Sequence, residues 1–304
     1  MGFDYIAIMM LIILSIILNA TVVFVLAYHF KKLKSRDFIL LSLAIADLIQ
    51  SLFGFPYLIT DYDNPLDQLA TPACIFSAFT VTVTAVTAIC HIVSLSVMFF
   101  LFLSYPFFAE KMESPMQVLL VFVLPCWMYG LLWGLFPLFG WSSYGKETAK
   151  GYRCGINMQE HNFNVLSYNI ALLFGACVFP VLVTFICYIR VTLIIKSLGG
   201  SAAQQNGSHS TMNEETRRQE YSMFVMSLIM FAAFILAWFP YASFVLITAF
   251  KYTPTQTMFD VAAILAKTSS FYNPLIYAFA YKEFRHKVCH IWKRFTNRNL
   301  ANVI

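Results

Sequence analysis

Two ionisable side chains, Lys267 and Asp47, lie deep within long apolar stretches of the chain. Burial disfavours a charged ammonium group, and a neutral lysine amine is a nucleophile that can condense with an aldehyde to form a Schiff base. A carboxylate such as Asp47 can hold a sodium ion or water within a polar network. The charge of Lys267 alone does not decide its role, because a buried lysine can equally form an ion pair or extend its amine toward a membrane surface.

The composition indicates an all-α membrane protein. Of the 304 residues, 60% are hydrophobic and only 12% are charged, whereas soluble domains average about 25% charged residues. This composition excludes a soluble globular chain and a disordered one. A helix needs about 20 apolar residues to span a bilayer, and a seven-helix bundle is expected over residues 5–281, after a short extracellular stub at 1–4. The seven expected spans are residues 5–30, 38–60, 68–109, 116–140, 164–195, 221–250 and 258–281.

The placement of basic residues predicts the orientation of the bundle. Lysine and arginine gather in the first loop, in the loop between the fifth and sixth spans, and in the tail, and such an excess marks cytoplasmic loops. We therefore expect a multi-pass protein of the plasma membrane, with its N-terminus outside and its C-terminus in the cytoplasm. Basic charge at membrane edges argues against a nucleic-acid partner. Residues 199–215 are rich in Gly, Ser, Asn and Gln, which predicts a flexible cytoplasmic loop.

The tail, residues 282–304, is predicted to form a short amphipathic eighth helix. Phe284, Val288 and Trp292 recur at steps of four residues, with basic residues beside them. A helix of this kind lies on an anionic lipid surface, so membrane lipid is an expected partner. Cys289 in this segment is either a palmitoylation site or a free thiol.

The cysteines favour one disulfide and no metal site. Of seven cysteines, Cys74 and Cys154 are the two that fall on the outer side, where an oxidising environment favours a bridge. No group of Cys and His residues has metal-ligand spacing. His91 is the only histidine in its span, which favours a hydrogen-bonded core residue over a metal ligand. The sequence contains neither a phosphate-binding glycine loop nor a nucleophile–base pair, so no motif indicates an enzyme.

The residues around Lys267 resemble the seventh helix of the opsins. Lys267 stands six residues before Asn273, which with Pro274 and Tyr277 completes an Asn-Pro-x-x-Tyr motif. In the opsins a lysine at this spacing forms a Schiff base with retinal, which is the 11-cis isomer in the dark. The resemblance therefore implies that Lys267 binds retinal and that the three motif residues act in activation.

Other motifs fit the same family along nearly the whole chain. Asn19 and Asp47 match activation residues of the first and second helices of rhodopsin-like receptors. The run Trp238-Phe239-Pro240-Tyr241 looks like the switch motif of the sixth helix. The resemblance places Trp238 against the retinal ring and Tyr241 beside it.

A protonated Schiff base is a buried cation and needs an anion nearby. Vertebrate visual opsins have a glutamate three residues after the third-helix cysteine, and this position is Ser77 here. That departure favours an invertebrate non-visual type of opsin. Many other opsins use a glutamate six residues after the outer-loop tryptophan, which predicts Glu147 as the counterion, with Asp260 as the second candidate. If neither serves, the Schiff base is unprotonated and absorbs in the ultraviolet.

The third helix departs further from the family. An Asp/Glu-Arg-Tyr triplet is expected 24 residues after Cys74, and the residues there are Met98-Phe99-Phe100. In the family this arginine pairs with an acidic residue of the sixth helix at rest and contacts the G protein when active. Glu220 stands where the acidic partner belongs, but its arginine is missing. The charge-assisted contact with a heterotrimeric G protein is thus absent.

These observations support three functions, in decreasing order. The first is a light-sensing G-protein-coupled receptor, not an enzyme, in which retinal on Lys267 isomerises and drives a rearrangement of the helices. The second is a retinal photoisomerase or a retinal-binding protein that does not signal, which the missing arginine favours. The third is a receptor for a diffusible ligand, in which Lys267 is incidental.

Overall fold

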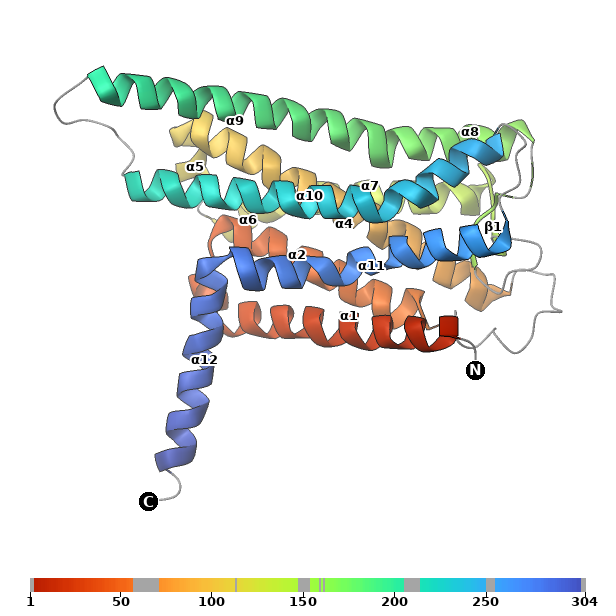
Figure 1. The fold of residues 1–304 in the computed structure, drawn as a ribbon, viewed down its shortest axis with the longest axis horizontal. Coiled ribbons are helices and arrows are strands. Elements are labelled where there is room, and N and C mark those ends of the chain that lie inside the picture. Colours follow the sequence, from red (N-terminus) through yellow and green to blue (C-terminus); the bar gives the residue numbers. More distant parts are fainter. Residues whose placement is uncertain are drawn as a thin grey trace.

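The computed structural model describes residues 3–56, 71–112, 114–146, 154–158, 160, 162–204, 214–249 and 255–301. Within these residues seven long helical segments run side by side (Figure 1). In chain order the segments are α1 (Phe3–Tyr28); α2 (Ser35–Ile49) with the π-helical turn η2 (Gln50–Gly54); α4 (Pro72–Ser104); α6 (Pro115–Val118), η3 (Leu119–Val123), α7 (Leu124–Leu135) and η4 (Phe136–Phe139); α8 (Phe163–Leu173), η5 (Phe174–Val178) and α9 (Phe179–Gln204); α10 (Glu214–Ala249); and α11 (Gln256–Ala280).

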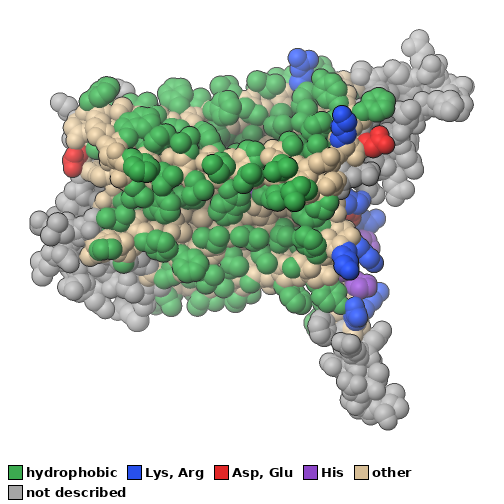
Figure 2. Space-filling view, turned by 180° about the vertical axis from the view of Figure 1, so that it is seen from behind, with side chains coloured by type: hydrophobic (Ala, Val, Ile, Leu, Met, Phe, Trp, Pro, Cys, Tyr) green, Lys and Arg blue, Asp and Glu red, His purple; other side chains and the backbone are tan. Residues whose placement is uncertain are grey.

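Shorter elements close the two ends of the bundle. One end carries η1 (Phe30–Lys32), α5 (Pro106–Lys111) and α12 (Lys282–Ala301), and it is named the basic end because lysines and arginines gather there. The opposite end carries the antiparallel pair β1 (Tyr144–Lys146) and β2 (Cys154–Ile156), and it is named the hairpin end. Figure 2 shows hydrophobic side chains over the waist of the molecule and blue Lys and Arg side chains at one end.

The all-α bundle predicted from the sequence is confirmed. Among the described residues, six helical segments are long and apolar enough to cross a membrane. The seventh segment, α11, is less apolar because it carries Lys267 and several hydroxyl and amide side chains. The predicted eighth helix is present as α12, which leaves the bundle at a steep angle (Figure 1).

Some predicted boundaries differ from the structure. The third helix ends at Ser104 instead of continuing to residue 109, because Pro106 forces the residue before it out of the helical conformation. In the predicted loop 199–215, α9 continues to Gln204 and α10 begins at Glu214, while residues 205–213 lie outside the described residues. In α12, Phe284 and Ile291 are buried, whereas Trp292 of the predicted apolar face is exposed.

Helix α4 is the centre of the bundle and packs against α2, α7, α9 and α10. Its close approach to α7 depends on glycine. A Cβ atom on Gly130 would lie 2.1 Å from the Thr87 Oγ1 atom and 2.5 Å from the Val83 carbonyl oxygen. Small residues at helix contacts are typical of membrane bundles, where close packing replaces the hydrophobic effect as the force between helices.

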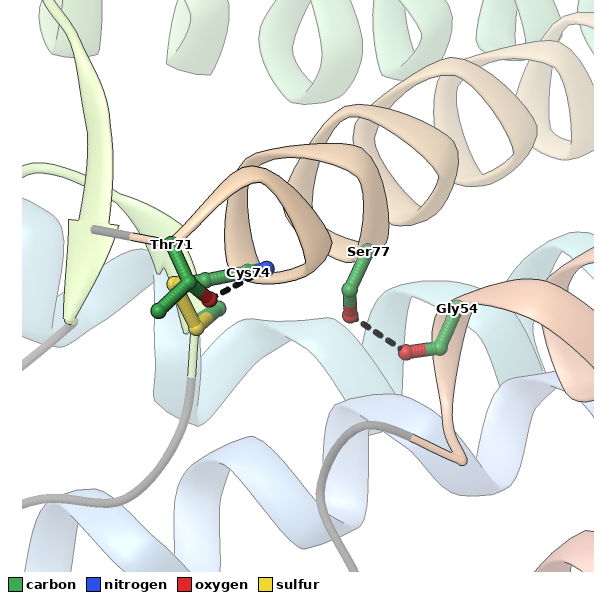
Figure 3. Close-up of a disulfide and its surroundings, with 5 residues drawn as sticks. Gly54, Thr71, Cys74 and Ser77 are labelled. Carbon is green, nitrogen blue, oxygen red and sulfur yellow. Dashed lines mark hydrogen bonds between the residues drawn. A yellow bond between two sulfur atoms is a disulfide. The ribbon is translucent and has the colours of Figure 1, made fainter. Parts of the chain in front are cut away.

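A disulfide at the hairpin end ties β2 to the beginning of α4. Cys74 and Cys154 are bonded, with 5.3 Å between their Cα atoms, which confirms the predicted bridge. The backbone N–H of Cys74 donates to the Thr71 hydroxyl, which caps the helix (Figure 3). The bridge holds the β1–β2 pair across the end of the bundle.

We expect Gly130→Ala to destabilise the protein by about 1–3 kcal/mol, because the new methyl group must push α7 away from α4. A loss of stability is informative here, because Gly→Ala inside a helix otherwise stabilises a protein by about 0.5–1 kcal/mol. Thermal unfolding of the purified protein measures the effect, with Met128→Ala on the exposed face of α7 as the control. Equal stability of Gly130→Ala and the wild type would contradict the close contact.

Candidate functional site

A cavity of about 130 Å³ lies between α4, α8, α10, α11 and β2. Its wall is mostly apolar, and Lys267 is part of it with only 9% of its surface exposed. Helix periodicity explains the placement, because Ala263, Ala266 and Lys267 follow the i, i+3, i+4 spacing of one helix face. The amine of Lys267 is thus held within an apolar compartment, where it can act as a nucleophile toward a hydrophobic aldehyde.

Three aromatic residues of α10, Phe234, Trp238 and Tyr241, share the cavity wall with Lys267. The Trp238 indole N–H donates to the Ser269 hydroxyl at 3.0 Å, which links α10 to α11. Trp238 also stacks on Phe234, with 5.7 Å between ring centroids, and meets Tyr241 edge-on at 5.8 Å. The structure therefore brings Lys267, Trp238 and Tyr241 together around one cavity.

Two of the positions considered for the counterion, Ser77 and Asp260, are not part of the cavity wall. Ser77 is buried but is not part of the cavity wall, and its hydroxyl donates to the Gly54 carbonyl at 2.6 Å (Figure 3). Asp260 lies one turn into α11, outside the wall. Glu147 lies outside the described residues. Among the described residues that line the cavity, none carries a carboxylate.

A buried polar network joins α1, α2 and α11 on the basic-end side of Lys267. The Asn273 side-chain N–H donates to the Asp47 carboxylate at 3.0 Å, and the Asn19 amide donates to the Ser270 carbonyl at 2.8 Å. The Ser15 hydroxyl lies 2.7 Å from the Ser51 hydroxyl and 3.0 Å from that of Ser270. We call these six residues the inner polar network.

The three serines of the inner polar network were not predicted from the sequence. A signal was present, since Ser15 stands four residues before Asn19 and Ser51 four residues after Asp47. That spacing puts each serine on the same helix face as the polar residue beside it. Tyr277, one turn beyond Asn273, is fully buried, and its hydroxyl has no hydrogen-bond partner among the described residues.

Comparison with known proteins agrees with these features. The family described as 7 transmembrane receptor (rhodopsin family) matches residues 18–277. Green-sensitive opsin-1 of Psalidodon fasciatus is 31% identical over 291 residues, which cover 93% of this chain and 78% of that protein. The chain is an opsin of the rhodopsin family. Red-sensitive opsin of Gallus gallus is 28% identical over 93% of this chain and 77% of its own length.

A solved structure supports the fold independently. The crystal structure of squid rhodopsin superposes with a TM-score of 0.82 at 20% identity, over 96% of this chain and 85% of that chain. This opsin is accordingly a multi-pass membrane protein and a light-sensing receptor, not an enzyme. Its family couples to heterotrimeric G proteins. Neither the photoisomerase nor the receptor for a diffusible ligand is favoured by these relatives.

The basic end of this opsin lacks the charged triplet of its family. Met98 and Phe99 are buried as members of the apolar core. The hydroxyls of Ser96 on α4 and Ser227 on α10 lie 3.2 Å apart. Of Glu220 only the backbone, within α10, is described.

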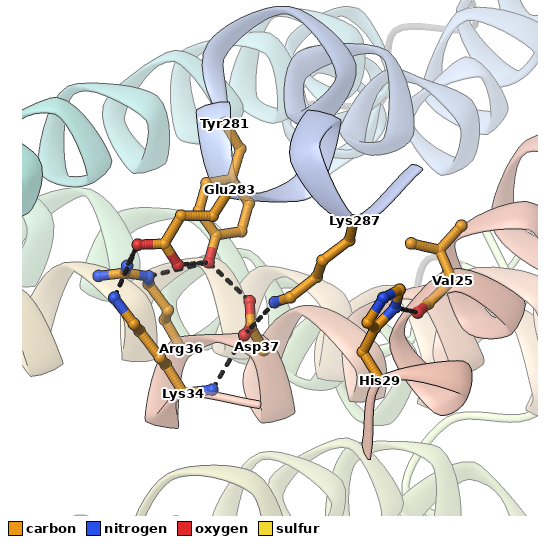
Figure 4. A network of polar contacts seen from close by, with 8 residues as sticks. All are labelled: Val25, His29, Lys34, Arg36, Asp37, Tyr281, Glu283 and Lys287. Carbon is orange, nitrogen blue, oxygen red and sulfur yellow. Dashed lines mark hydrogen bonds and ion pairs between the residues drawn. The ribbon is translucent and has the colours of Figure 1, made fainter. Parts of the chain in front are cut away.

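Charged residues at the basic end form a second network that the sequence did not reveal (Figure 4). Arg36 of α2 donates to the Tyr281 hydroxyl at 3.0 Å and pairs with Glu283 at 2.7 Å. The Tyr281 hydroxyl donates to the Asp37 carboxylate at 2.7 Å. Lys34 pairs with Glu283 at 2.7 Å, and Lys287 pairs with Asp37 at 2.6 Å. We call these six residues the basic-end network.

Neighbouring cations shift the titration of Glu283. Partial burial raises its pKa, but the hydrogen bond from Lys34 and the charge of Arg36 outweigh burial and lower the pKa from an ordinary value of 4.5 to about 2. A carboxylate whose pKa is depressed by folding stabilises the folded state above its unfolded pKa. That contribution is lost as the pH falls from about 4.5 toward about 2.

We expect Glu283→Gln to unfold at a lower temperature than the wild type at neutral pH, because the glutamine cannot form the two ion pairs. The difference should narrow progressively below about pH 4.5, as the wild-type carboxyl group becomes protonated. Thermal unfolding across this pH range measures the effect. A difference that stays constant between neutral pH and pH values near 2 would contradict the depressed pKa.

Proposed function

We propose that this opsin binds retinal as a Schiff base on Lys267, with the 11-cis isomer bound in the dark. The observation that carries the proposal is the position of Lys267 in the wall of an apolar cavity that also holds Trp238 and Tyr241. Retinal is a long apolar aldehyde, so it fits both the amine and the apolar lining. When bound, it supplies the capacity to absorb light and change shape.

The residues of the cavity divide into distinct tasks. Lys267 would anchor the ligand, and the rings of Trp238 and Tyr241 line the space beside it from α10. The hydrogen bond from Trp238 to Ser269 couples α10 to the lysine-bearing helix, so pressure on the indole ring acts on both helices. Pro240 and Pro274 interrupt the hydrogen bonds of α10 and α11 and provide positions where these helices can bend.

The charge balance of the site supports Glu147 as the first candidate for the counterion. Among the described residues, the cavity wall offers no carboxylate, and Ser77 is engaged with Gly54. A carboxylate from the segment that contains Glu147, or Asp260 on α11, would supply the anion. Since the visual counterion position is neutral, the chain fits an opsin of invertebrate non-visual type.

The same proposal orients the opsin in the plasma membrane. The basic end faces the cytoplasm, because lysine and arginine are retained on that side, and the disulfide-bonded hairpin end faces the oxidising exterior. A heterotrimeric G protein binds the basic end without the family arginine. Helix movement that starts at Trp238 reaches this end through α11, Asn273 and Tyr277.

We expect the purified protein to gain a light-sensitive absorption band after incubation with 11-cis-retinal, and Lys267→Ala to lose this band. The band requires the amine of Lys267, so Lys111→Ala, which removes an exposed lysine of α5, should retain it. Absorption spectra before and after illumination measure the effect. A band of full size in Lys267→Ala, or no band in the wild type with any retinal isomer, would overturn the proposal.

The counterion can be identified by a matched pair of variants. Glu147→Gln should move a visible band into the ultraviolet at neutral pH, because the Schiff base loses its proton when the anion is removed. Asp260→Asn should leave the band in place. The reverse result would assign the counterion to Asp260, and an ultraviolet band in the wild type would show that neither carboxylate serves.

A further inference from the structure

The basic-end network joins three elements that are far apart in the sequence. Arg36 and Asp37 belong to the first turn of α2, Tyr281 stands between α11 and α12, and Glu283 and Lys287 belong to α12 (Figure 4). We propose that this network is the lock that holds the basic end of the opsin in its resting state, and that it must open when the receptor is activated. The proposal adds a regulatory site to the proposed function, and its physical test does not depend on retinal.

Two charged side chains of the basic-end network are buried, so they depend on the partners that they have in this arrangement. The side chain of Arg36 is 5% exposed and that of Asp37 is fully buried. A buried charge that loses its partner is strongly destabilising, so each member holds the others in place. Arg36 and Lys287 also lie over the ring of Tyr281, with 5.5 and 5.9 Å to the ring centroid. Tyr281 is therefore clamped through both its hydroxyl group and its ring.

The position of Tyr281 gives the network control over α11. Tyr281 directly follows this helix, and its backbone adopts an extended conformation where α11 ends and α12 begins. It stands one turn after Tyr277 and seven residues after Pro274. Any displacement of the end of α11 must therefore pull Tyr281 away from Arg36 and Asp37. Bending at Pro274 would displace Tyr281 and so open the network.

The opposite side of the basic end offers a weaker polar connection. Between α4 and α10 the described residues include the hydroxyl pair of Ser96 and Ser227, and Phe99 packs there as an apolar residue. Two neutral hydroxyls form a weaker contact than ion pairs with charge-assisted hydrogen bonds. Among the described residues, the ion pairs at this end connect α2 and the residue before it with α12, beside the α11–α12 junction.

Opening would also change what the basic end offers to a partner. Lys34 and Arg36 line a cavity of about 370 Å³ whose wall includes Met98 and Phe102. In the closed network both cations pair with Glu283. When α12 carries Glu283 away, these two cations face the cavity, where an acidic group of a cytosolic partner can take the place of the carboxylate.

The test measures the distance between α12 and η1 in the retinal-free protein. One spin label is attached to Cys289, which is exposed on α12, and a second to the cysteine introduced by Lys31→Cys in η1. Pulsed electron paramagnetic resonance then measures the distance between the two labels. We expect one narrow distribution in the parent protein and an added, longer population in Glu283→Gln and in Tyr281→Phe. Tyr281→Phe keeps the ring and removes only the hydroxyl. It therefore tests whether the network holds α12 near η1 even if Glu283→Gln folds poorly.

Two controls separate the lock from general charge effects. Lys32→Gln removes an exposed cation of η1 and should leave the distribution unchanged. Arg36→Gln combined with Glu283→Gln should open the end by less than the sum of the two single variants, because the two residues share one ion pair. Unchanged distances in both Glu283→Gln and Tyr281→Phe, or equal broadening in Lys32→Gln, would overturn the proposal.

A functional measurement follows the same variants. Basal nucleotide exchange on a G protein in the dark should rise about fivefold or more when the lock is removed. An absence of exchange in every variant, illuminated or dark, would count against G-protein coupling and not against the lock, which the label distances decide.

Discussion

A bilayer core holds no water, so polar groups of a spanning helix must find their partners inside the protein. Helix α11 is strongly constrained by this condition, because it carries a lysine, an asparagine and two serines. Its partners lie on three other helices: Asn273 meets Asp47 on α2, Ser270 meets α1, and Ser269 meets Trp238 on α10. The position and rotation of α11 are thereby fixed, and Lys267 is aimed at the central cavity as a consequence.

Close packing between helices acts together with these hydrogen bonds to position the helices. Lipid tails are as apolar as leucine, so apolar side chains alone do not draw membrane helices together. The glycine at position 130 lets α7 approach the backbone of α4 directly, and the disulfide holds the hairpin over the same helix. Helix α4 is thus held in place by close packing against α7 and by the disulfide. The helices that carry the cavity's reactive and aromatic residues, α10 and α11, instead contain proline and can bend.

The middle of α11 and its terminus at the basic end are restrained by different physical means. Near the cavity, Trp238 and Ser269 share one neutral hydrogen bond, which a bound ligand can disturb at small cost. At the basic end, buried ion pairs hold Tyr281. An arrangement that separates such a pair leaves a buried charge without its partner, which disfavours other arrangements of this end. A receptor needs this combination, because it must rest in one state and still change state when its ligand changes shape.

The class of the protein and its seven-helix bundle could be predicted from the sequence, as could the presence of Lys267 and Trp238 beside one cavity. Apolar length reveals the spans, and motif spacing relates Lys267, Asn273 and Trp238 to one another along their helices. The hydrogen bonds from Ser77 to Gly54 and from Arg36 to Tyr281 became visible only in the folded bundle. The latter pair is 245 residues apart. Basic residues near a membrane surface look alike in sequence, and their partners are fixed only when the packing of helices brings distant segments into contact.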